Sequence, residues 1–102
     1  MAPEIYRFRF ESDACMKDVH ESLLLSIFAA EGVHGRSCIR MDVAFFADDD
    51  KRALVVDART EAGHTVARIF TNFLLRQFGE ETFQVERVGR QREDDLVAEA
   101  RR

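Results

Sequence analysis

The chain has 102 residues, the size of one domain, and 46% of them are hydrophobic, which is enough for a single core. Its net charge of −4, from 15 basic and 19 acidic residues, argues against binding to nucleic acid or to an anionic membrane, because both need a basic protein surface. No apolar run approaches the ~20 residues of a membrane span, and the N-terminus lacks a signal-peptide pattern.

Residues 5–11 alternate between apolar and charged side chains, which predicts a strand. Its inward residues are aromatic: Tyr6, Phe8 and Phe10. Ser12 or Asp13 then offers an N-cap for a helix that runs to about Ala30, with Gly32 in the stop that follows. The apolar stripe of this helix, with Leu24 at its edge, is formed by Met16, Val19, Leu23, Ile27 and Ala30.

Residues 38–59 predict a hairpin of two strands around a polar turn at 47–51. The alternating apolar residues are Ile39, Met41, Val43 and Phe45 in the first strand and Leu54, Val56 and Ala58 in the second. The run Asp48-Asp49-Asp50 lacks the alternate carboxylates, the glycine and the glutamate of a calcium-binding loop. We therefore interpret it as a solvated turn.

Thr60 is the expected N-cap of a second helix that ends at Gly79. The predicted buried stripe consists of Ala62, Val66, Ile69, Phe70, Phe73 and Leu74. Gly63, in the first turn, either allows a close approach by another segment or weakens the helix. Residues 82–88 predict the last strand, with Phe83 and Val85 inward.

The predicted order is βαββαβ, which gives an α+β two-layer sandwich: an antiparallel sheet in strand order 4-1-3-2 with two helices on one face. Over residues 5–88 this order resembles the ferredoxin-like split βαβ superfold, which hosts many unrelated functions. We expect one domain at 1–88 and a charged tail or short helix at 89–102. Phe8, Ile27, Val56 and Phe73 are the predicted central core.

The residue types that commonly act in catalysis or metal binding do not form a recognisable motif in this sequence. Cys15 and Cys38 have neither metal-binding nor redox spacing, which favours a reduced, cytoplasmic protein. His20, His34 and His64 lack the spacing of metal ligands, so we expect hydrogen-bonded structural histidines. We predict no catalytic residue, metal or cofactor.

The uncovered face of the predicted sheet should carry charged residues, and four of them are the candidate ligand-binding set: Arg7, Arg9, Arg40 and Asp57. One interpretation is a solvated face with weak ion pairs across the strands. A second is a platform for an anion or another small ligand, and a third is a dimer interface between two sheets.

The outer surface of the two predicted helices carries two Leu-Phe pairs, formed by Leu25, Phe28, Leu75 and Phe78. A contiguous apolar patch of this kind usually marks an interface, here most simply in a two-fold homodimer. Alternatively, the C-terminal segment with Leu96 and Val97 covers these residues, or they are scattered and exposed.

Together these patterns favour a non-enzymatic interaction or assembly module that acts as a homo-oligomer. The alternative is a domain that binds or transforms a small anionic ligand on the open sheet face. We expect no nucleic-acid or membrane partner, and the sequence does not identify a protein partner.

Overall fold

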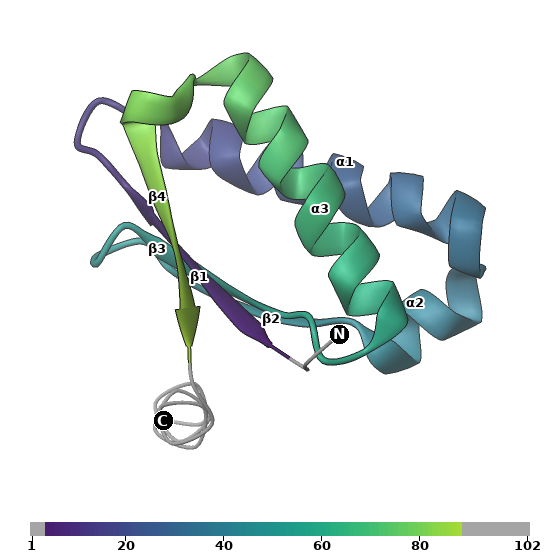
Figure 1. Cartoon of the computed structure of the whole chain (residues 1–102). Coiled ribbons are helices and arrows are strands. Elements are labelled where there is room, and N and C mark those ends of the chain that lie inside the picture. Colours follow the sequence, from purple (N-terminus) through teal and green to yellow (C-terminus); the bar gives the residue numbers. More distant parts are fainter. Residues whose placement is uncertain (1–3, 89–102) are drawn as a thin grey trace.

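The computed structural model describes residues 4–88, which form an α+β fold with one helix more than predicted (Figure 1). The elements in chain order are β1 (Ile5–Phe10), α1 (Met16–His34), α2 (Arg36–Asp42), β2 (Ala44–Asp48), β3 (Ala53–Asp57), α3 (Glu61–Gln77), the 3-10 turn η1 (Glu80–Thr82) and β4 (Phe83–Val88). The predicted tail or short helix at 89–102 lies outside the described residues.

The four described strands form an antiparallel sheet in the order β2-β3-β1-β4. Read from the other edge, this is the predicted neighbour order 4-1-3-2. The central strand β1 pairs with β3 and with β4, so that Phe8 lies between Leu54 and Val85. Figure 1 shows α1 and α3 on the same side of this sheet.

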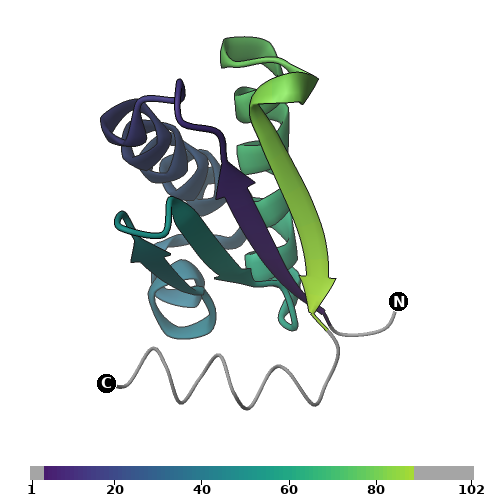
Figure 2. The same cartoon turned by 90° about the vertical axis from the view of Figure 1, so that its left-hand side faces the viewer.

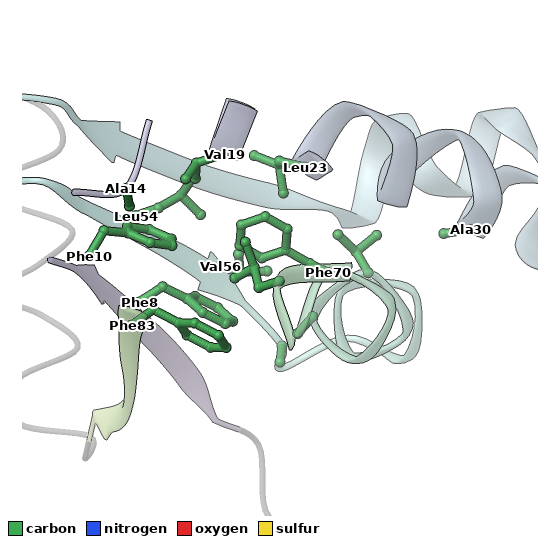
Figure 3. Close-up of a cluster of buried hydrophobic side chains, with 14 of the residues drawn as sticks. Phe8, Phe10, Ala14, Val19, Leu23, Ala30, Leu54, Val56, Phe70 and Phe83 are labelled. Atoms are coloured by element: carbon green, nitrogen blue, oxygen red, sulfur yellow. The ribbon is translucent and has the colours of Figure 1, made fainter. Parts of the chain in front are cut away.

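The hydrophobic core lies between the sheet and these two helices (Figure 3). Phe8 and Phe70 are both fully buried, and their rings meet edge to face with centroids 4.9 Å apart. The predicted core residues Phe8 and Val56 are confirmed. Ile27 is only partly buried against the core.

Phe73 is also only partly buried, so its predicted place in the central core is wrong. The buried face of α3 centres on Val66, Phe70 and Leu74 and includes the small residues Gly63 and Ala67. Phe73 lies roughly 60° around the helix from Phe70. The small side chains allow α3 to approach the sheet closely on the side away from Phe73.

Helix α1 begins and ends later than predicted. It has no side-chain N-cap, and it continues through Gly32 to Gly35, whose φ of 88° ends it. Glycine adopts a positive φ at little energetic cost because it has no Cβ. Gly35 also donates its N–H to the carbonyl of Glu31, which completes the end of the helix. Leu24, expected at the edge of the buried stripe, is exposed.

Residues 36–42 form helix α2 and not the first half of the predicted strand. Ile39 is buried, whereas Met41, expected on the same side of a strand, is 84% exposed. Ile39 and Val43 are four residues apart, so their apolar character fits a helical turn as well as an alternating strand. The strand β2 therefore begins only at Ala44, and Arg40 lies on a helix.

The turn between β2 and β3 covers residues 49–52, so it begins two positions later and ends one position later than predicted. Asp48 accepts the backbone N–H of Lys51 through its side chain, and Arg52 takes a positive φ of 52°. The Arg52 guanidinium donates to the carbonyl oxygens of Glu11 and Ala14. The hairpin turn is thereby attached to the segment that leads into α1.

The predicted N-cap of α3 is confirmed, because the Thr60 hydroxyl accepts the N–H of Gly63 at 3.0 Å. The same hydroxyl donates to the carbonyl of Asp42 at 2.9 Å, so it joins the end of α2 to the start of α3. Replacing Thr60 with Ala is expected to lower the free energy of unfolding by about 1–2 kcal/mol, because both bonds are lost. Urea denaturation measures the loss, and Thr60→Ser, which keeps the hydroxyl, should recover most of it. Equal stability of Thr60→Ala and wild type would contradict the capping role.

Candidate functional site

The outer edge of β2 is the least protected border of the described sheet. β2 carries Phe45 and Phe46, which are 51% and 39% exposed, and its one charged residue is Asp48 at the end of the strand. The other edge strand, β4, carries Glu86 and Arg87, which form ion pairs with Arg9 and Glu4. Natural proteins commonly protect sheet edges with such charges, so β2 is the edge that is open to pairing.

The register of the hairpin places the two phenylalanines on opposite faces of the sheet. Phe45 pairs with Val56, whose side chain belongs to the core, and so lies on the helix side. Phe46 pairs with Val55 and lies on the open side. Figure 2 shows β2 (teal) at one border of the sheet and β4 (yellow-green) at the other. The exposed apolar surface of β2 therefore continues around the edge from one face to the other.

The two ends of this edge carry opposite charges. Arg36 and Arg40 lie on α2, which precedes β2, although Asp42 lies there as well. Asp48, Asp49 and Asp50 follow at the other end, although Lys51 and Arg52 belong to the same turn. The Asp49 carboxylate lies 2.7 Å from Nε2 of His20. The edge thus runs from a basic end to an acidic end.

The structure separates one of the four predicted ligand-binding residues from the other three. Arg7, Arg9 and Asp57 lie on the sheet, but Arg40 lies on α2. Arg9 pairs with Glu86 at 3.2 Å.

The Asp57 carboxylate is already engaged by a neighbour. It accepts the backbone N–H of Arg59 and two bonds from its guanidinium, at 2.7 and 2.9 Å. Burial raises the pKa of Asp57, but the bonds and charge of Arg59 outweigh burial and leave the pKa below its ordinary value. A ligand on this face would have to compete with Arg59 for Asp57.

The predicted apolar helix surface is divided. Leu25, Phe28 and Leu75 are exposed, but Phe78 packs against the core. Gln77 hydrogen-bonds to Ser22 of α1, and Leu75, two residues earlier, points to nearly the opposite side of α3. Leu75 is therefore turned away from α1, which carries Leu25 and Phe28.

The thiols and imidazoles do not form a reactive or metal-binding group. The Cys38 thiol donates to Asp42 at 3.3 Å, and this bond, more than burial, raises the pKa of Cys38, which opposes thiolate formation. Nε2 of His34 lies 2.7 Å from the Thr65 hydroxyl oxygen, within hydrogen-bond distance. No cluster of three potential metal ligands occurs within residues 4–88.

The sequence contained a partial signal for the β2 edge. The predicted strand order already placed this strand at a border, and two adjacent phenylalanines in a strand must point to opposite faces. The helix surface and the charged sheet face carry more pronounced patterns in the sequence. Because residues 38–42 alternate like a strand, the sequence does not reveal that β2 is a short apolar strand with charged flanks.

Comparison with protein-family models, with curated proteins and with solved structures finds no significant match to this chain. No helix in the described part of the chain is both long and apolar enough to cross a membrane.

Proposed function

We propose that the protein is a homodimeric assembly module whose subunits join through the free edges of β2. The observation that carries this proposal is a sheet edge with two exposed phenylalanines and no protecting charge along its length. An unprotected edge of this kind readily pairs with another strand. A two-fold dimer pairs the edge with its own copy and leaves neither β2 edge exposed.

Antiparallel pairing centred on Phe46 suits the sequence of β2. Phe46 then lies beside the partner's Phe46 on the open face. Phe45 lies beside the partner's Ala47 on the helix face, where a large residue meets a small one. Cross-strand aromatic pairs contribute roughly 0.2–1 kcal/mol each, and the buried apolar area contributes about 25 cal/mol per Å² in addition.

The charges at the two ends support a second copy as the partner. In the antiparallel dimer, the basic end of each edge lies beside the acidic end of the other. Arg36 and Arg40 are thus brought toward the partner's Asp48 and Asp50. Such complementarity mainly favours correct orientation and fast association, and Asp42 and Lys51 reduce it in part.

We also infer that the domain is ferredoxin-like, with α2 as an addition between α1 and β2. The strand order and the position of α1 and α3 on one side of the sheet support this inference. The two free thiols support a cytoplasmic location. A catalytic or ligand-binding role for the open sheet face has less support, since Arg40 is displaced and both Arg9 and Asp57 are engaged.

Sedimentation equilibrium is expected to show a dimer for the wild type and a monomer for the double variant Phe45→Glu, Phe46→Glu. The dissociation constant of the dimer should rise about a hundredfold or more, because central aromatic residues of interfaces contribute ~2 kcal/mol each. Both positions are exposed, so the variant should retain its fold, which circular dichroism verifies.

The matched control is the double variant Leu25→Glu, Leu75→Glu, which places the same charges on exposed helix positions and should leave the dimer intact. A wild type that stays monomeric at high micromolar concentration contradicts dimerisation itself. A dimer that only the helix variant dissociates instead supports the interface on the helices.

A further inference from the structure

A groove lies between α3 and β4, beside the edge of the sheet opposite to β2. Its volume is about 380 Å³, within the range of small-ligand sites. Tyr6 and Val85 come from the sheet, while Ala67 and Thr71 come from α3. Val85 faces the helix layer in register with Phe8, yet it is 41% exposed because the layer does not cover it fully.

The base of the groove is mainly apolar. The Thr71 hydroxyl donates to the carbonyl of Ala67, so it is already engaged. The Tyr6 hydroxyl donates to Glu4 at 2.7 Å, and this bond, followed by burial, raises the pKa of Tyr6. The Glu4 carboxylate also forms an ion pair with the Arg87 guanidinium at 3.5 Å. Arg87 therefore offsets the negative charge of Glu4 only in part, and Glu4 disfavours an anion close to the Tyr6 hydroxyl.

The α3 wall of the groove carries a row of hydrogen-bonding side chains. His64, Arg68 and Asn72 follow one another at intervals of four residues, so they lie on the same side of the helix. None of the three side chains has a hydrogen bond or ion pair with another residue of the described segment 4–88. The guanidinium of Arg68 supplies a fixed positive charge and paired donors that match the oxygens of a carboxylate or phosphate.

We propose that this groove binds a small organic oxyanion. Arg68 holds the carboxylate or phosphate, His64 and Asn72 supply further hydrogen bonds, and an apolar body of the ligand covers Tyr6 and Val85. The apolar base excludes a purely ionic site, and Arg68 disfavours a neutral ligand. The groove borders β4 and not β2, so the proposal does not depend on dimerisation.

The test is an NMR titration of the full chain with phenyl phosphate and with benzoate, which separate the two oxyanion classes, and with benzyl alcohol as the neutral probe. Saturable shifts at Ala67 and Val85 are expected with at least one of the anions. Arg68→Gln should weaken that binding about tenfold or more. Lys17→Gln, at an exposed lysine of α1 that does not line the groove, should leave it unchanged.

The spectra also show directly whether each variant is folded. The proposal is overturned if neither anion saturates, if the shifts map away from Ala67 and Val85, or if benzyl alcohol binds as well as the anions. It is also overturned if Arg68→Gln and Lys17→Gln weaken binding equally, because that result indicates nonspecific attraction to positive charge.

Discussion

Replacing Phe70 with Ala is expected to lower the free energy of unfolding by about 3–5 kcal/mol, the usual loss for a buried phenylalanine. Phe70 is fully buried, and its ring contacts Phe8 in the edge-to-face arrangement at the centre of the core. Its removal forfeits this contact and leaves a cavity that the surrounding strands and helices can fill only in part. The loss is a large fraction of the ~5–15 kcal/mol that stabilises a typical domain.

Urea denaturation followed by circular dichroism measures this effect. The matched control is Phe28→Ala, because Phe28 lies on α1 with 57% of its surface exposed and has little packing to lose. The free energy of unfolding of Phe28→Ala should differ from that of the wild type by no more than about 0.5 kcal/mol. The loss of stability for Phe73→Ala should lie between those for Phe28→Ala and Phe70→Ala, since Phe73 is partly buried. A larger loss for Phe73→Ala than for Phe70→Ala would mean that α3 is rotated from the position described.

Replacing Gly63 with Ala is expected to destabilise the protein by about 1–3 kcal/mol or more. In an unconstrained helix interior this substitution stabilises, because alanine is the better helix former. Here the added Cβ would overlap the backbone carbonyl oxygen of Asp57 and would lie 3.0 Å from the Thr60 hydroxyl. The first turn of α3 would have to move away from β3, which would strain the cap at Thr60.

Gly32 provides the opposite control in the same protein. It lies within α1, and no atom from elsewhere lies within 4 Å of a Cβ built on it. Gly32→Ala should therefore raise the free energy of unfolding by about 0.5–1 kcal/mol. Thermal and urea denaturation of the two variants should give changes of opposite sign. A stabilising Gly63→Ala would disprove the close contact between α3 and β3.

Local patterns in the sequence determined β1, β3, α3 and the cap at Thr60. In these segments the apolar residues recur with one clear period over enough positions to distinguish a strand from a helix. Burial of one face and a side-chain cap are local requirements, so they are visible in the order of residues. The alternation of Phe8 and Phe10 with charged residues is one example, and the run from Val66 to Leu74 is another.

Tertiary structure alone decided between two interpretations of residues 36–42 and between two glycines as the end of α1. Ile39 and Val43 fit both periods, whereas Met41 fits only the strand, and its exposure in the folded chain decides for the helix. Gly32 and Gly35 have the same chemistry, but only Gly35 occupies a positive φ. The groove was invisible for the same reason: Tyr6, Arg68 and Val85 are far apart in sequence, and they come together only because β1 lies between β3 and β4 under α3.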